Sequence, residues 1–111
     1  MIDRPPQRGD VWLVSFDTAA GGEIQKTRPA VVLSNDTANA LLNRVQVVPV
    51  SSQVERRYPA ETYLSLNGER RKAMADQITT ASKHRLQRCL GVLSTDDLDA
   101  AARVVRLQLD L

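Results

Sequence analysis

Arginine and serine side chains at the ends of two apolar runs are the residues of this sequence best suited to act on a phosphate. Arg28 directly precedes the apolar run that begins at Pro29. Ser51 and Ser52 directly follow another apolar run. Because consecutive strands often pair as neighbours, the two places are expected to meet at one sheet edge, where a guanidinium fork and a hydroxyl would form a phosphate clamp. The same residues also fit a plain reading, a loop cation before proline and a serine turn after a strand.

Other residues that could carry chemistry are few. His84 is the only histidine, so no acid–base pair of imidazoles can form within the chain, and its position between Lys83 and Arg85 indicates a surface residue. The single Cys89 excludes an internal disulfide and a cysteine zinc cluster. Arg85 and Arg88 could lower the pKa of this thiol, but a half-buried, unreactive cysteine is the reading we favour. No metal-ligand motif or phosphate loop is present, so no metal and no cofactor is expected.

The length and composition indicate one globular domain. A chain of 111 residues is long enough for one domain and too short for two, so residues 1–111 are expected to form a single domain. The hydrophobic fraction of 42% and the charged fraction of 25% are ordinary for a folded protein. No apolar run approaches the ~20 residues that a membrane span needs. The N-terminus lacks the apolar stretch of a signal peptide, and a cytoplasmic protein is therefore expected.

The charges are unevenly distributed although the net charge is only +2. Basic residues are clustered at Arg56–Arg57, at Arg70–Lys72, and at Lys83, Arg85 and Arg88. Acidic residues are concentrated near the C-terminus, at Asp96, Asp97, Asp99 and Asp110. This asymmetry predicts one basic face and one acidic end, although solvated loops and helix faces would give the same clusters.

The apolar patterning predicts a mostly β chain. Strands are expected at residues 11–16, 29–34, 45–50, 62–66, 73–78 and 91–93, where apolar and β-branched residues are frequent. Pro29 is expected as the first residue of its strand, and Pro49 is expected to mark an edge or a bulge, because proline donates no ladder hydrogen bond. The pair Asn67-Gly68 predicts a tight turn, and residues 17–27 predict a long loop.

Helical segments complete the predicted architecture. A short helical turn is expected over residues 37–43, with Leu41 and Leu42 inward, and a short helix over residues 82–88. A long C-terminal helix is expected to begin at Ser94-Thr95, since acidic residues in its first turn interact favourably with the helix dipole. Its predicted apolar face consists of Leu98, Ala101, Ala102, Val105 and Leu109. These elements predict a compact β-barrel covered by the long helix.

Four blocks of sequence also resemble a known family. They follow one another over nearly the whole chain as Arg8–Trp12, Lys26–Asp36, Val48–Ser52, and Asp76–Thr80 with Lys83, Arg85 and Leu86. In order and spacing they resemble the MazF/PemK (Kid) toxins of type II toxin-antitoxin systems. The resemblance implies a mainly β fold, an SH3-like barrel of the PemK/MazF/CcdB kind with a C-terminal helix, assembled as a homodimer.

The resemblance also implies an activity and a partner. The implied activity is metal-independent, sequence-selective cleavage of single-stranded RNA, usually messenger RNA, which leaves a 2′,3′-cyclic phosphate and a 5′-hydroxyl. The implied partner is a cognate MazE-like antitoxin, whose acidic, disordered tail lies across the RNA groove. No membrane association is implied.

Individual residues can be assigned through the same resemblance. The family's catalytic arginine corresponds to Arg28, and its catalytic hydroxyl residue, usually threonine, corresponds to Ser51. The implied RNA-binding residues are Phe16, Gly22, Glu23, Ile24, Gln25, Lys26, Ser52, Gln77 and Lys83. Gly22 and Ile24 replace the serine and glutamine that are frequent in relatives, so the recognised RNA sequence cannot be transferred.

Two other functions share parts of this pattern. CcdB-type toxins have the same barrel and act on DNA gyrase by binding rather than by cutting RNA. The pair Arg28 and Ser51, together with the basic clusters, favours the ribonuclease. A small module that binds single-stranded nucleic acid would display stacking aromatic residues, which make up only 4% of this chain.

Overall fold

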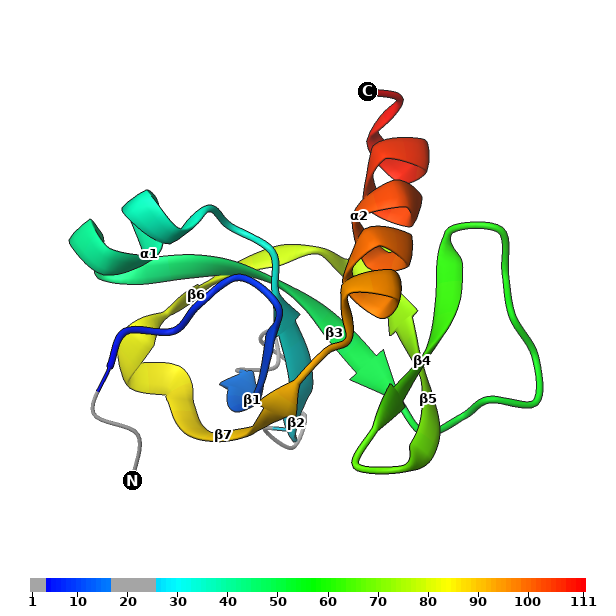
Figure 1. The fold of residues 1–111 in the computed structure, drawn as a ribbon, viewed down its shortest axis with the longest axis horizontal. Helices are drawn as coiled ribbons and strands as arrows, with labels where there is room; N and C mark the ends of the chain where they lie inside the picture. Colours follow the sequence, from blue (N-terminus) through cyan, green and yellow to red (C-terminus); the bar gives the residue numbers. More distant parts are fainter. Residues whose placement is uncertain (1–3, 17–25) are drawn as a thin grey trace, which may run out of the picture.

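The computed structural model describes residues 4–16 and 26–111, which form one antiparallel sheet and two α-helices (Figure 1). The strands are β1 (Asp10–Phe16), β2 (Lys26–Val32), β3 (Arg44–Ser51), β4 (Glu61–Leu66), β5 (Glu69–Met74), β6 (Thr79–Ser82) and β7 (Leu86–Val92). The helices are α1 (Asp36–Leu41) and α2 (Thr95–Leu109), with single 3₁₀ turns η1 (Ala75–Gln77) and η2 (Lys83–Arg85). The predicted mainly β class with a C-terminal helix is confirmed. Within the described ranges, no helix is long and apolar enough to cross a membrane.

Strand β3 organises the sheet, because it pairs with three other strands. The order is β4-β5-β3-β2-β1-β7, and β6 also pairs with β3. On the edge away from β2, residues 44–47 pair with β6, and Val50 and Ser51 pair with β5. Pro49 lies opposite Ala30 of β2, in the gap between these two partners. Pro49 therefore lies where β3 changes its partner, rather than at the predicted sheet edge or bulge, and no N–H donor is needed at this place in the ladder.

Strand β2 begins earlier than predicted. It starts at Lys26, so Pro29 is its fourth residue rather than its first. Pro29 pairs with Leu13 of β1. Pairing of β2 with β3 covers only Ala30 to Val32. Alternate residues of a strand direct their N–H groups toward the same neighbouring strand. Because the N–H of Leu33 donates to the carbonyl of Gln46 in β3, an N–H at Pro29 would also point toward β3, where the ladder does not extend to Pro29. The missing N–H of Pro29 therefore costs no ladder bond.

The two ends of the sheet curl toward each other. The hairpin between β4 and β5 turns at Asn67 (φ 53°) and Gly68 (φ 82°), as predicted. The Asn67 side-chain amide donates to the carbonyl of Leu90 in β7 at 3.1 Å. A barrel-like shape results, although β4 and β7 do not pair as strands.

The segment after this hairpin differs from the prediction. The strand expected at residues 73–78 begins directly after the turn, at Glu69, and ends at Met74. The short helix expected over residues 82–88 is wrong: it is the 3₁₀ turn η2, followed at once by β7. Pairing of β6 with β3 and of β7 with β1 explains the difference, because these long-range ladders override the local helical pattern.

Both faces of the central strands are buried, which explains their nearly continuous apolar runs. One core contains Val31, Val48 and Val50 together with Ala101 of α2. The other core contains Val32, Val47 and Trp12. Alternating residues of β2 and β3 thus serve opposite cores.

The helices agree only in part with their predicted faces. Helix α2 begins where expected, because the Ser94 hydroxyl accepts from the N–H of Asp97 at 3.1 Å. It lies beside β4 (Figure 1), with Ala101 buried as predicted, whereas Leu109 is 49% exposed. Leu41 and Leu42 of the first helical turn were expected to point inward, but they are 78% and 42% exposed. That helix has six residues and buries only Asn39, which binds Ser34.

A buried carboxylate holds the N-terminal segment on the sheet. Asp10, which is 1% exposed, accepts hydrogen bonds from Arg4 at 2.9 Å, from the backbone N–H of Gln7 at 2.8 Å and from the Trp12 indole at 3.1 Å. Burial acts to raise the pKa of Asp10, but the bonds from Arg4, Gln7 and Trp12 outweigh it and hold the pKa below its usual value.

Folding stability should therefore fall in acid. A carboxyl whose pKa is lowered by folding stabilises the protein above its unfolded pKa of about 3.9, and this stability is lost as the pH falls through the folded pKa. Asp10→Asn should lower the free energy of unfolding by about 1–3 kcal/mol at pH 7 and flatten its dependence below about pH 4. Urea unfolding of both proteins between pH 3 and pH 7 measures this. An unchanged acid limb in the variant would show that Asp10 does not carry the effect.

Candidate active site

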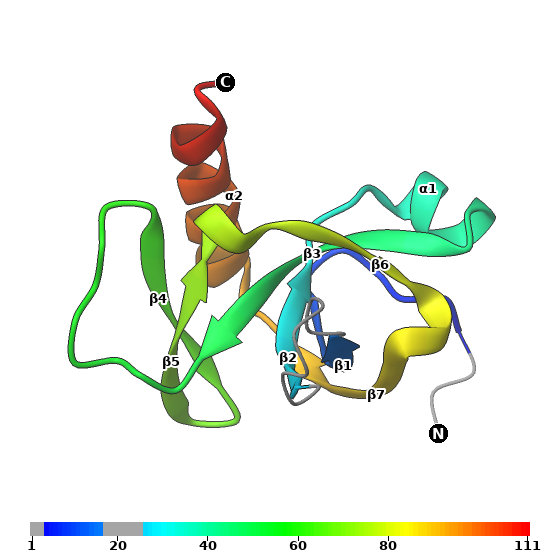
Figure 2. The same ribbon diagram turned by 180° about the vertical axis from the view of Figure 1, so that it is seen from behind.

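The two predicted phosphate-binding positions line one groove. It has a volume of about 470 Å³ and is formed by the start of β2, the end of β3 and one residue of β5. Its lining residues are Lys26, Thr27, Arg28, Pro29, Val50, Ser51, Ser52, Gln53 and Arg71. Figure 2 shows why these segments converge: β3 ends beside β5, and β2 runs next to β3.

Arg28 is a half-buried cation without a counterion in the part of the chain that the structure describes. It lies in β2 opposite Val14 of β1, three residues before the fully buried Val31. No hydrogen bond or ion pair joins its guanidinium to residues 4–16 or 26–111. Its N–H donors are therefore available to an anion that enters the groove.

Ser51 is the last residue of β3 and has its hydroxyl fixed from one side. Its Oγ accepts a hydrogen bond from the backbone N–H of Gln53 at 3.0 Å. A hydroxyl that accepts such a bond still has its own O–H to donate. No acceptor among the described residues binds that O–H, so it can be donated into the groove.

The loop after Ser51 is held by a buried ion pair. Lys72, which lies opposite Ser51 in the ladder, contacts Glu61 at 3.0 Å, and each residue is 6% exposed. The Lys72 ammonium also donates to the carbonyl of Arg56 at 2.8 Å, and the Glu61 carboxylate accepts from the N–H of Tyr58 at 2.8 Å. Lys72 is therefore neutralised and does not belong to the basic face that its sequence cluster predicted.

The groove contains a cation that was not among the predicted site residues. Arg71 lines it from β5 and forms an ion pair with Glu69 at 3.0 Å. Arg70–Lys72 is a basic cluster in the sequence, but only one of its three residues reaches the groove. Pairing of Ser51 with Lys72 brings this part of β5 to the site, and no local pattern in the sequence indicates that long-range pairing.

The other predicted RNA-binding residues are distributed over several places. Lys26 and Ser52 line the groove. Gly22, Glu23, Ile24 and Gln25 lie outside the described residues. Phe16 packs partly buried against the core around Trp12, Gln77 is exposed in η1 with its amide 3.7 Å from the Met74 sulfur, and Lys83 begins η2. None of these last three lines the groove.

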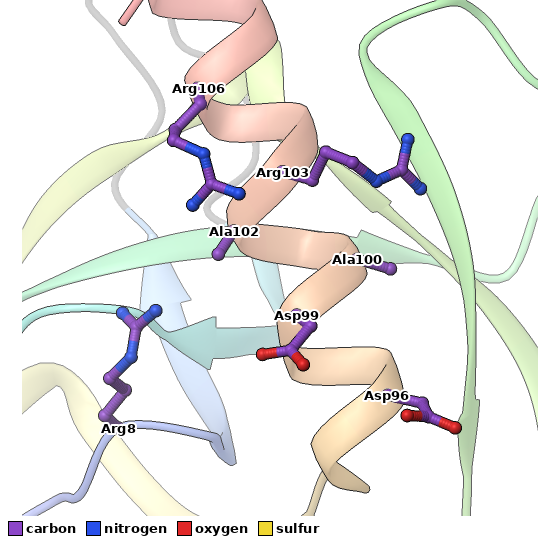
Figure 3. A pocket seen from close by; sticks show the side chains of 7 residues that line it. All are labelled: Arg8, Asp96, Asp99, Ala100, Ala102, Arg103 and Arg106. Carbon is purple, nitrogen blue, oxygen red and sulfur yellow. The ribbon is translucent and has the colours of Figure 1, made fainter.

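A larger cavity of about 580 Å³ lies along α2 (Figure 3), and neither Arg28 nor Ser51 lines it. Its cations Arg8, Arg103 and Arg106 are accompanied by the carboxylates of Asp96 and Asp99, so it offers no cluster of a single charge. Over the described ranges, no group of three or more His, Cys, Asp or Glu side chains is placed to hold a metal ion.

Cys89 and His84 take no part in the groove. His84 is exposed, as predicted. Cys89 is half-buried, and its thiol donates to the carbonyl of Gly91 at 3.5 Å. Burial raises the pKa of Cys89, so the proposed lowering by neighbouring arginines is wrong and the reading as an unreactive cysteine is supported.

Comparison with known proteins places this geometry in context. The model of the family described as PemK-like, MazF-like toxin of type II toxin-antitoxin system matches residues 7–109. The endoribonuclease MazF9 of Mycobacterium tuberculosis is 39% identical over 95% of this chain and 97% of its own length. A MazE-MazF crystal structure from Deinococcus radiodurans superposes with a TM-score of 0.83 at 27% identity, covering 98% of this chain and 99% of that one. A mycobacterial endoribonuclease in complex with its cognate antitoxin shares the fold, with a TM-score of 0.78 at 21% identity and 96% coverage of both chains.

Proposed function

Because the chain belongs to the PemK-like, MazF-like toxins of type II toxin-antitoxin systems and is an endoribonuclease of that family, we propose that it cleaves single-stranded RNA at the groove between β2, β3 and β5. The proposed reaction needs no metal and is selective for RNA sequence, with messenger RNA as the substrate. It leaves a 2′,3′-cyclic phosphate and a 5′-hydroxyl. Arg28 and Ser51 are the proposed catalytic residues.

The proposed reaction uses a nucleophile that RNA itself carries. The 2′-oxygen attacks the adjacent phosphorus, the bond to the 5′-oxygen breaks, and the proton lost from the 2′-hydroxyl is balanced by one gained at the leaving oxygen. The protein must align these atoms and stabilise the negative charge on the phosphorane. It need not activate water.

Arg28 and Ser51 are suited to that task by their free donors. The observation that carries the proposal is the half-buried Arg28 guanidinium, unpaired within residues 4–16 and 26–111, in one groove with the Ser51 O–H. A guanidinium fork can donate two hydrogen bonds to phosphate oxygens, and the hydroxyl adds a third. We assign Arg28 to charge stabilisation rather than proton transfer, because a guanidinium is costly to deprotonate.

We expect Arg28→Ala to slow RNA cleavage by about 1000-fold and Ser51→Ala by about 100-fold, because each removes donors aimed at the charge of the transition state. Ser51→Thr should retain most activity, since it keeps the hydroxyl. Single-turnover cleavage of a long RNA, with thermal melting of each variant, provides the measurement. Arg44→Ala is the matched control, because Arg44 lies exposed at the opposite end of β3. Full activity of Arg28→Ala, or a large loss of its melting temperature, would contradict the catalytic assignment.

Removal of one oxygen atom from the substrate tests whether the 2′-hydroxyl is the nucleophile. Replacing the ribose on the 5′ side of the mapped cut by deoxyribose should abolish cleavage and leave binding nearly unchanged, because phosphate contacts dominate affinity. Duplex RNA should resist, since a paired strand cannot align the 2′-oxygen with the leaving oxygen. The reactions are run in excess EDTA, which should not slow cleavage of the all-ribose control. Continued cutting of the deoxy substrate, a 5′-phosphate product, or loss of activity in EDTA that magnesium restores would overturn the mechanism.

We also propose that residues 1–111 form one toxin domain, which assembles as a homodimer and binds a MazE-like antitoxin. Among the described residues, apolar side chains are exposed on this single chain at Leu41, Leu42, Val92, Leu107, Leu109 and Leu111, and a partner that covered them would bury apolar surface. The groove cations Lys26, Arg28 and Arg71 suit an acidic antitoxin tail.

Light scattering of the purified chain at micromolar concentration should give about twice the chain mass of 12.3 kDa, because the exposed apolar surface favours association. Addition of the antitoxin should release bound RNA, since its acidic tail would occupy the same groove. A species of 12.3 kDa alone would contradict the dimer. An antitoxin complex that still binds RNA with unchanged affinity would contradict the shared groove.

A further inference from the structure

Arg71 is the one groove residue supplied by β5 within the described ranges, and its neighbours in the strand face elsewhere. It lies opposite the buried Leu64 in the hairpin ladder. Directly paired residues share a face of the sheet, so Arg71 extends from the face that β4 and β5 turn toward the core. The core residue Ala73 follows two positions later on the same face. Arg71 thereby emerges at the rim of the groove, beyond the end of β3 at Ser51.

Arg70 shows how different the adjacent position is. Its guanidinium lies 3.7 Å from the centre of the Tyr63 ring, and it lines a separate cavity with Asp97. The alternation of the strand thus separates two neighbouring arginines, one stacked on an aromatic ring and one in the groove. They form a natural pair of test and control positions.

The present partners of Arg71 leave it available to a ligand. One terminal nitrogen, Nη2, contacts the Glu69 carboxylate at 3.0 Å, and the other, Nη1, donates to the carbonyl of Arg70 at 3.0 Å. The Glu69 side chain is 68% exposed, whereas that of Arg71 is 27% exposed. An ion pair with such an exposed carboxylate is weak, so the Glu69 side chain can turn into solvent when a phosphate binds Arg71. A phosphate offers the same bidentate geometry to the guanidinium.

We propose that Arg71 is a second phosphate-binding residue, which holds the phosphate next to the scissile one and so sets the register of the RNA on Arg28 and Ser51. In the free protein Glu69 holds the Arg71 guanidinium in place, and a phosphate of the RNA displaces the Glu69 carboxylate when the RNA binds. The inference rests on the proposed function, because it assumes that the scissile phosphate lies between Arg28 and Ser51. Arg71 is thus a binding and positioning residue, whose removal weakens the complex more than it slows the bound substrate.

The salt dependence of RNA binding tests this assignment directly. The probe is a short single-stranded RNA with deoxyribose on the 5′ side of the mapped cut, titrated at several salt concentrations. Loss of one phosphate contact should reduce the magnitude of the negative slope of log K against log salt by about 0.7 in Arg71→Gln. On all-ribose RNA the same variant should raise KM by about tenfold and change kcat by less than about threefold. Arg71→Lys should restore the slope, because it keeps the charge, but only part of the affinity.

Two further variants make the result decisive. Arg70→Gln should leave the slope and KM as they are in the unmodified protein, since Arg70 does not line the groove. Glu69→Gln should tighten RNA binding by severalfold, because the phosphate no longer displaces a carboxylate. An unchanged slope in Arg71→Gln, an equal effect of Arg70→Gln, or, should Arg71→Gln fail to fold, the absence of tighter binding in Glu69→Gln overturns the assignment. Undiminished cleavage by Arg28→Ala would instead overturn the proposed function, and the two failures are thus distinguishable.

Discussion

Strand β3 has to satisfy two partners along one edge, and the arrangement of the molecule follows from that constraint. Its first half pairs with β6 and its last two residues pair with β5, while β2 occupies the other edge. A strand cannot turn from one neighbour to the next without a place where the ladder is interrupted, and a residue without an N–H fits that place. Pro49 lies there, and Ser51 follows two residues later, where β3 and β5 part. The position of the groove is thus a consequence of how the sheet divides.

Two cations near Ser51 show how the fold treats charge in different ways. Lys72 is buried, and it is fully neutralised by Glu61 and by a loop carbonyl, so it contributes to structure and not to the field of the groove. Arg28 is only half-buried and has no such partner in the described part of the chain. Removal of water by a bound RNA would strengthen its interaction with a phosphate, because the effective dielectric constant falls. Lys72 thus stabilises the structure around the groove, whereas the Arg28 guanidinium is available to a ligand in it.

Local patterns in the sequence were sufficient for features that depend on neighbours in the chain. The turn at Asn67-Gly68, the start of α2 at Ser94 and the apolar central strands depend on φ preferences, capping and burial, all of which act over a few residues. Leu41 and Leu42 were misplaced because an apolar side chain on a six-residue helix does not by itself indicate which side faces the core.

Long-range pairing explains the remaining differences. The segment after Ser82 was predicted as helix, yet β7 forms because β1 offers it a ladder. The sequence brings Arg28 and Ser51 together because Arg28 directly precedes the second predicted strand and Ser51 directly follows the third, and the structure places both in one groove. The sequence does not bring Arg71 to the same place, because the pairing of β3 with β5 joins segments about twenty residues apart, and the buried Lys72 has the same sequence signature as its neighbours Arg70 and Arg71.

The loop between Ser51 and β4 is fixed largely through its main chain. The ammonium of Lys72 binds the Arg56 carbonyl, the Glu61 carboxylate binds the Tyr58 N–H, and the Tyr63 hydroxyl binds the Val54 carbonyl at 2.9 Å. Every residue type except proline has the N–H that such contacts use, and every residue type has the carbonyl. Side chains at the rim of the groove can therefore be exchanged during evolution while the path of the loop is retained. A toxin built in this way can acquire a preference for a different RNA without rebuilding the support of the proposed catalytic hydroxyl.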